Sequence, residues 1–253
     1  MSISRRTRFS IALALSVSSV LTYQKPAVCQ TEELPASFSW IDRGAVTPAK
    51  NQGEFGTCWA FAAIGLVEAL VRLETGEEVD LSEQHLISNI RMASPFAAVD
   101  FLKSTGVVRE AHLPYVGDTS SVNTERPGEF FLDEYTVTNV NRSPLSERVS
   151  TIKRIIYENG PVLTTMNLMH DFKSYESGVY VYDGHSREQS GGHIILIFGW
   201  TDDPDVTNGG YWILKNSAGT HWGENGFGKA AYGQAGIDDY YVIHGILRLR
   251  EPH

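Results

Sequence analysis

The sequence predicts an α+β fold, with a mostly helical N-terminal half and a mostly antiparallel β C-terminal half. Between residues 58 and 159, apolar residues recur at the three- and four-residue spacing of helices. After residue 160, short apolar runs alternate with clusters of Asp, Gly and Asn, which is typical of strands joined by turns. Helices grouped before strands, without regular alternation, favour the α+β class.

The first predicted helix covers residues 58–73. It is apolar on nearly every side apart from Glu68, which indicates a helix buried in a core. Gly76 ends it, and Ser82 is the expected N-cap of a second helix that opens at residues 81–84. Two more helices are predicted, at residues 97–104 and 145–159.

Strands dominate the remainder of the chain. Six are expected, at residues 161–166, 179–182, 193–200, 211–216, 226–231 and 241–249. The polar segment 118–128, which contains Pro and Gly, is the predicted boundary between a helical lobe at 47–125 and a β lobe at 126–250. The cleft between two such lobes is the default place for a functional site.

Residues 1–29 have the pattern of a signal peptide. Arginines at positions 5, 6 and 8 precede an apolar run over residues 9–21, and small residues follow before Cys29. The run is too short and too rich in serine for a good transmembrane span. We therefore expect a secreted or periplasmic domain, residues 30–253, without stable membrane insertion after signal removal. An N-terminal membrane anchor is the alternative.

Composition narrows the choice of partners. The chain has 253 residues, and 21 Lys and Arg against 30 Asp and Glu give a net charge of -9. This argues against nucleic-acid binding, which needs a positive face. Apart from His193, the histidines are scattered without the spacing of metal ligands. We expect no metal and no organic cofactor, and we expect a monomer.

Cys58 is the one cysteine that remains after the signal, and an unpaired cysteine in an exported protein is an intermolecular partner or a reactive thiol. The glycines before Cys58 allow a turn that places it in the first turn of the buried helix. There, free backbone N–H groups and the helix dipole favour a thiolate. Gln52 can direct an amide N–H to the same point and form an oxyanion hole with the Cys58 N–H. The alternative is a buried structural cysteine.

Two later segments offer partners for this thiol. His193 begins an apolar strand after Gly191 and Gly192, which allow another backbone to approach closely. It is the candidate general base. Asn216, at the end of the strand at 211–216, can fix the tautomer and orientation of that histidine. The alternatives are a structural histidine and a turn asparagine that bonds its own backbone.

Together these segments resemble the papain-like cysteine peptidases over residues 38–245. Shared blocks occur in the family's order: Gly-Ala-Val-Thr-Pro at 44–48, Gln52, Cys-Trp-Ala-Phe at 58–61, Leu-Ser-Glu-Gln at 81–84, Asn-Gly-Pro-Val at 159–162, Gly192-His193 and Asn216-Ser217. Residues 171–180 and 191–193 look most like the cathepsin B branch. The resemblance implies a helical N-terminal lobe, an antiparallel β-barrel-like C-terminal lobe and an active-site cleft between them.

The resemblance also implies a role for each site residue. Cys58 is the expected nucleophile, His193 the acid and base, Asn216 the residue that orients it, and Gln52 the oxyanion donor. The implied activity is hydrolysis of peptide bonds, most simply as an endopeptidase, with a peptide or protein as substrate. Glu68 matches a family acid whose role looks structural.

Gly192, Trp222 and Tyr240 are the predicted substrate-binding residues. Tyr240 falls at the base of the subsite for the residue two before the scissile bond, and we expect a shallow pocket there for small or compact apolar side chains. The tryptophan that follows Asn-Ser in the family is Ala218 here, so a water-excluding lid over the site is missing. We expect a lower turnover than in a typical relative, unless Trp222 or Trp200 fills the gap.

Other departures concern stability and control. The positions of family disulfide cysteines carry Phe55, Asn89 and Ala235 instead. The family's long inhibitory pro-segment is also not seen between the signal and residue 34, so a separate protein inhibitor is a candidate partner. Two rival functions stay open: an acyl-transfer enzyme that uses an amine as acceptor, and a catalytically silent papain-like fold that acts as an exported binding protein.

Overall fold

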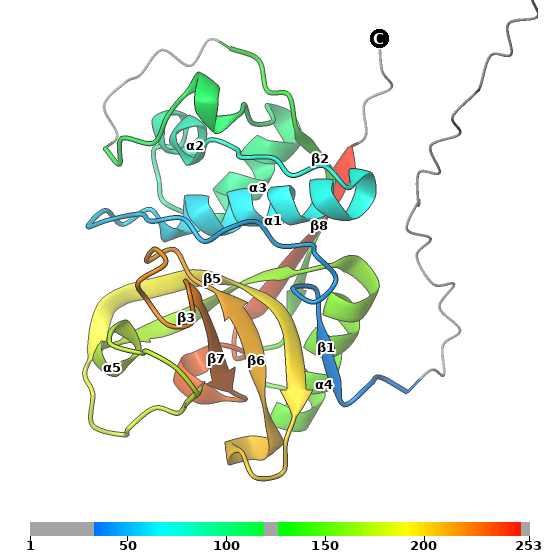
Figure 1. Ribbon diagram of the computed structural model, residues 1–253, viewed down its shortest axis with the longest axis vertical. Coiled ribbons are helices and arrows are strands. Elements are labelled where there is room, and N and C mark those ends of the chain that lie inside the picture. The colour runs from blue at the N-terminus through cyan, green and yellow to red at the C-terminus, as the bar shows by residue number, and fades with distance from the viewer. Residues whose placement is uncertain (1–32, 119–125, 249–253) are drawn as a thin grey trace, which may run out of the picture.

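The computed structural model describes residues 33–118 and 126–248. The predicted signal peptide therefore lies outside the described residues, as does most of the predicted lobe boundary. Figure 1 shows helices α1, α2 and α3 gathered on one side of the molecule and strands β3, β5, β6 and β7 on the other. No described helix is long and apolar enough to cross a membrane.

The predicted helices are confirmed. They are α1 (Cys58–Thr75), α2 (Glu83–Asn89), α3 (Pro95–Ser104) and α4 (Leu145–Asn159), and a short α5 (His170–Lys173) was not predicted. Gly76 ends α1 with a left-handed φ of 75°, and the Ser82 hydroxyl caps α2 by accepting a hydrogen bond from His85 N. Within the described residues, three single turns of 3₁₀ helix lie at Glu110–His112, Thr207–Gly209 and Gln234–Gly236.

Eight described strands form one sheet. They are β1 (Ser37–Ser39), β2 (Phe131–Asn139), β3 (Val162–Met169), β4 (Val179–Tyr180), β5 (Glu188–Asp202), β6 (Gly210–Lys215), β7 (Phe227–Ala231) and β8 (Tyr241–Arg248). The order is β2-β8-β3-β5-β6-β7-β4, with β1 paired to β5. All described pairings are antiparallel except that of β4 with β7.

The expectation of a barrel-like lobe is wrong. In the described sheet, β2 and β4 form the two ends of the order and do not pair with each other, so the sheet stays open. The physical reason is that β2 and β8 form a long arm: β2 pairs with β8 along its whole length, while β3 reaches only Ile243 and Val242 of β8. That arm extends toward the helices, where β2 contacts α3 and β8 contacts α1.

Strands β1 and β2 were missed by the sequence analysis. β1 has three residues, and β2 buries only its first two residues while most of the remainder is exposed. A strand without alternating burial leaves no period-two pattern to detect.

Helix α1 sets the position of the site by packing directly against β5. All thirteen residues from Trp59 to Val71 are buried. A Cβ atom at Gly65 would lie 2.7 Å from Leu196 Cδ1, so the helix touches the strand there with no room for a side chain. Cys58 lies seven residues before Gly65, and His193 lies three residues before Leu196. At about 1.5 Å per helical residue and about 3.3 Å per strand residue, Cys58 and His193 each lie roughly 10 Å from this contact. Both residues are therefore at the same end of the interface between α1 and β5.

Candidate active site

Cys58 is the first residue of α1. Thr57, the residue before it, makes no side-chain cap, and its hydroxyl bonds instead with the Tyr115 hydroxyl at 2.8 Å. Burial raises the pKa of the Cys58 thiol, and the backbone N–H groups of Ile194, Trp59 and Cys58 lower it by less. The helix terminus therefore lowers this pKa as expected, but burial outweighs the backbone donors and the net shift is upward.

His193, in β5, is held by Asn216 just after β6. Its Nε2 lies 2.7 Å from Asn216 Oδ1, and both side chains are buried. An amide oxygen only accepts, so Nε2 carries the hydrogen and Nδ1 is left for proton exchange. The same Oδ1 accepts the Ser217 backbone N–H at 2.8 Å, which fixes the amide orientation. Burial lowers the pKa of His193, the bond to Asn216 raises it, and the charge of Lys173 lowers it.

Gln52 is positioned from both sides. Its Oε1 accepts a hydrogen bond from the Ser217 hydroxyl at 2.5 Å, and its Nε2 donates to Phe55 O at 2.5 Å. The Gln52 backbone N–H also donates to Ser217 O at 2.8 Å. One hydrogen on Nε2 remains for an oxyanion. The turn after β6 therefore holds both the histidine and the amide donor.

These residues meet in a cleft of about 690 Å³. Gln52, Cys58, His193 and Asn216 all line it, and so do Gly192 and Trp222. Tyr240 does not line this cleft. It is 37% exposed, and its hydroxyl donates to Asn167 Oδ1 at 3.2 Å. The structure thus brings together six of the seven predicted site residues.

An aromatic wall flanks His193. The Phe172 ring lies 6.4 Å from the His193 ring, centre to centre, and 5.0 Å from Trp222. Trp222 is fixed by a 2.9 Å hydrogen bond from Nε1 to Phe172 O. Trp200 is fully buried elsewhere, stacked on Phe38. Of the two tryptophans considered as substitutes for the lid, only Trp222 lines the cleft, which Ala218 also lines.

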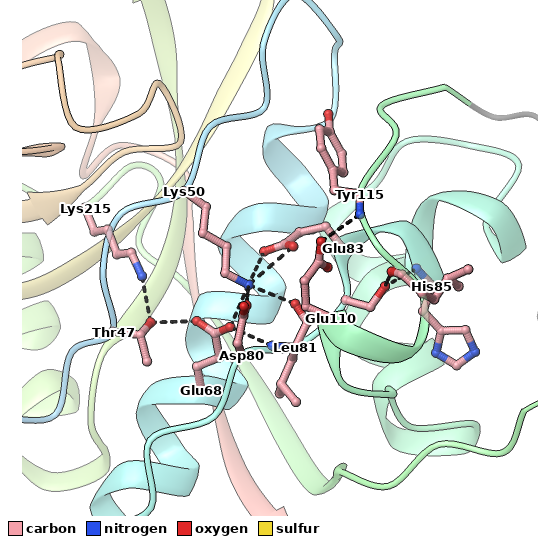
Figure 2. A network of polar contacts seen from close by, with 12 residues as sticks. Thr47, Lys50, Glu68, Asp80, Leu81, Glu83, His85, Glu110, Tyr115 and Lys215 are labelled. Atoms are coloured by element: carbon pink, nitrogen blue, oxygen red, sulfur yellow. Dashed lines mark hydrogen bonds and ion pairs between the residues drawn. The ribbon is translucent and has the colours of Figure 1, made fainter.

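A network of charged side chains reaches Lys215, the residue before Asn216 (Figure 2). Lys215, next to Asn216, donates to Thr47 Oγ1 at 2.9 Å, and Thr47 donates to Glu68 Oε2 at 2.6 Å. Glu68 pairs with Lys50 at 2.8 Å and accepts the Leu81 N–H. It is 1% exposed and joins α1 to the strand end that carries Asn216, which supports its structural interpretation.

Lys50 is the centre of this network. It contacts Glu68, Glu83 and Asp80 at 2.8, 3.1 and 2.6 Å. Burial opposes its charge, but Glu83, Glu68 and Asp80 together raise its pKa. Burial, assisted by the Glu68 carboxylate, raises the pKa of Glu83 to about 8 against the pull of Lys50. Among the described residues no three His, Cys, Asp or Glu side chains gather as a metal site.

Comparison with known proteins identifies the family. Residues 34–244 match the papain family cysteine proteases. The chain belongs to the papain family. The bromelain protease from Ananas comosus, solved in complex with an inhibitor, shares the fold with a TM-score of 0.70 at 28% identity. That match covers 85% of this chain and 100% of the bromelain chain.

Other papain-family relatives are longer. The chain is 33% identical over 232 residues to a probable cysteine protease of Arabidopsis thaliana, covering 83% of this chain and 62% of the relative. It is 31% identical over 230 residues to pro-cathepsin H of Mus musculus, covering 84% of this chain and 66% of the relative. The chain thus spans less than two thirds of the length of these two relatives.

Sequence reasoning missed two side chains that shape this papain-family site. Ser217 was noted only as part of a shared block, although it orients Gln52. Lys173 was not singled out, although it lines the cleft beside His193. A hydroxyl or a charge on a short segment carries no pattern of its own, so the sequence held no signal for either role.

Proposed function

We propose that this protein is a cysteine peptidase that hydrolyses peptide bonds through a thioester on Cys58. The observation that carries the proposal is the 2.7 Å contact between His193 Nε2 and Asn216 Oδ1 in the cleft that Cys58 also lines. It commits Nε2 to Asn216 and leaves Nδ1 to exchange a proton with the thiol. Membership of the papain family supports the same activity.

The first half of the reaction forms the thioester. The Cys58 proton moves to His193 Nδ1, and the thiolate attacks the carbonyl carbon of the scissile bond. The remaining Nε2 hydrogen of Gln52 and the Cys58 N–H stabilise the oxyanion of the tetrahedral intermediate. His193 then gives its proton to the departing amine, the C–N bond breaks, and the acyl group stays on sulfur.

The second half restores the enzyme. Neutral His193 takes a proton from water, and the hydroxide attacks the thioester carbonyl. The C–S bond breaks, the acid leaves and the thiolate takes the proton back. No step needs a group other than these side chains and water.

The test is covalent labelling of the purified protein with a peptidyl epoxide, followed by peptide mapping and a peptide hydrolysis assay. We expect one label per chain on Cys58, loss of hydrolysis on labelling, and neither label nor hydrolysis in Cys58→Ala. A well-folded protein that takes no label and cleaves no peptide would instead support the silent binding protein.

Acyl transfer is the second candidate, and Ala218 favours it. Ala218 lines the cleft, and its methyl group blocks less of an incoming acceptor than an indole at this position would. Product analysis with an added amine separates the two reactions: a peptidase gives mainly the free acid, whereas an acyl-transfer enzyme gives mainly the amide at millimolar amine.

We propose an endopeptidase that acts as a monomer on peptide or protein substrates outside the cytoplasm. The pattern of residues 1–29 supports export. Expression of the full chain followed by N-terminal sequencing tests the location. A mature N-terminus near residue 30 in the exported fraction is expected, and an intact N-terminus in the cell fraction would contradict it.

A further inference from the structure

Helix α5 lies beside the cleft, and its successive side chains have different surroundings. Phe172 is buried against His193 and Trp222. Asp171 does not line the cleft, and its Oδ1 accepts a hydrogen bond from the Tyr180 hydroxyl at 2.9 Å. Lys173 is exposed and lines the cleft together with His193. Asp171 and Phe172, the two residues before Lys173 in α5, are fixed by these contacts. The backbone of Lys173 is therefore held beside the cleft that His193 lines.

Lys173 has no partner among the described residues, unlike every other described lysine. Four of the others form ion pairs with carboxylates and Lys215 donates to Thr47; the four are Lys50, Lys103, Lys153 and Lys229. Glu54 and Glu176 line the same cleft, but neither forms an ion pair with Lys173. The cleft therefore contains one free ammonium group that faces solvent and substrate.

This ammonium group lies on the leaving-group side. In the proposed reaction His193 gives its proton to the departing amine, so the leaving segment lies against the residues around His193. α5 belongs to these residues through Phe172, and Ala218 and Trp222 line the same cleft. A segment of two residues spans roughly 7 Å, comparable to the reach of a lysine side chain.

We propose that Lys173 selects substrates that carry a carboxylate within the first two residues after the scissile bond. The inference rests on the proposed peptidase function and names its substrate class. The carboxylate is either an Asp or Glu side chain or the C-terminus of a short leaving segment. An ammonium group pairs with both, and the test below distinguishes them.

A bound carboxylate also affects the chemistry. Burial is the main cause that lowers the pKa of His193, and the charge of Lys173 lowers it further. A carboxylate on Lys173 cancels that charge beside the imidazole. This favours the protonated His193 that the departing amine requires, so substrates with the carboxylate gain in the chemical step as well as in binding.

The experiment compares matched peptides with one acyl part and different leaving segments. Asp is compared with Asn at the first and at the second position, each with an amidated C-terminus. A third pair, Ala-Ala with a free or an amidated C-terminus, tests the chain terminus. We expect kcat/KM to be roughly three- to fivefold higher for the carboxylate member of at least one pair, as for an exposed ion pair. The preference should decrease at high salt.

Variants assign the preference to Lys173. We expect Lys173→Gln to bring the ratio close to one and Lys173→Glu to invert it. Lys103→Gln changes the net charge equally on α3, outside the cleft, and should keep the wild-type ratio. Epoxide labelling gives the active fraction of each variant.

The outcomes are distinct. A preference for the Asp side chain identifies an acid-selective endopeptidase, and a preference for the free C-terminus identifies a carboxydipeptidase; both support the inference. Hydrolysis with equal rates in every pair, or a preference that survives Lys173→Gln, overturns the inference alone. Absence of hydrolysis for every peptide overturns the proposed function together with it.

Discussion

The hydroxyl of Ser217 donates a 2.5 Å hydrogen bond to Oε1 of Gln52, a residue 165 positions earlier in the chain. Ser217 is also the residue whose N–H bonds Oδ1 of Asn216. A single turn after β6 therefore controls the orientation of the histidine and of the oxyanion donor. If either amide rotated, the reaction would lose a hydrogen bond that matters mainly in the transition state.

Ser217→Ala tests this link. We expect kcat to fall several-fold with little change in KM, because Gln52 loses the contact that directs its N–H and one such hydrogen bond contributes about 1 kcal/mol. Steady-state kinetics on one peptide measure it. Ser104→Ala, where the hydroxyl bonds the backbone of its own helix and the adjacent Thr105 hydroxyl, outside the cleft, serves as the control. A fall confined to KM would point to a binding role instead.

Ala218→Trp tests the missing lid. An indole at this position would cover the Asn216–His193 bond and exclude water, which strengthens the electrostatic interactions in the site. We expect kcat to rise a few-fold on peptides with small leaving residues, as measured under saturating substrate. No change, or a decrease, would mean that Trp222 already excludes the water.

The pH profile of kcat/KM follows from the two shifted groups. Catalysis needs one proton shared by Cys58 and His193, so activity declines when the pair gains a second proton or loses the shared one. Burial lowers the pKa of His193 from 6.5, which moves the acid limb to lower pH. Burial raises the pKa of Cys58 from 9.0, which moves the alkaline limb to higher pH. We expect a broad bell-shaped profile whose acid limb lies below pH 6.5 and whose alkaline limb lies above pH 9.0.

Lys173 provides a check on the acid limb. Its positive charge lowers the pKa of His193, so Lys173→Gln should shift that limb upward in pH while the alkaline limb moves less. Profiles measured with an amidated, uncharged peptide keep the substrate from titrating. A narrow bell that lies inside pH 6.5 to 9.0 would contradict the effect of burial on both groups.

Glu83 makes stability depend on pH. Its carboxyl pKa is 4.5 when unperturbed and is raised to about 8 in the folded protein. Between these values the folded state keeps a proton that the unfolded state releases, so this group lowers the free energy of unfolding as pH rises from 4.5 toward 8. Glu83→Gln removes the effect and leaves Lys50 paired with Glu68 and Asp80.

We therefore expect the stability of Glu83→Gln relative to wild type to increase steadily with pH across that window. Urea unfolding at several pH values measures the difference. Glu134→Gln removes an exposed carboxylate that pairs with Lys103 and should show no such trend. A constant difference between Glu83→Gln and wild type would mean that Glu83 stays ionised in the folded protein.

Much of the fold could be predicted locally. The apolar run after Cys58, the cap at Ser82 and the amphipathic pattern of α4 are properties of neighbouring residues, and each element formed where expected. β2 could not be predicted, because its stability comes from pairing with β8, more than a hundred residues later in the chain, and not from a buried face of its own.

The candidate site divides in the same way. By itself the sequence determined the helix that carries Cys58, the strand that carries His193, the strand that Asn216 follows, and, through the resemblance, which residues to expect together. Only the tertiary structure decided that the sheet stays open, that Tyr240 lies outside the cleft, that Ser217 bonds Gln52 and that Lys173 lines the cleft. The physical reason is that residue type and spacing encode local structure, whereas hydrogen bonds and charges across the chain depend on packing such as that of Gly65 against Leu196.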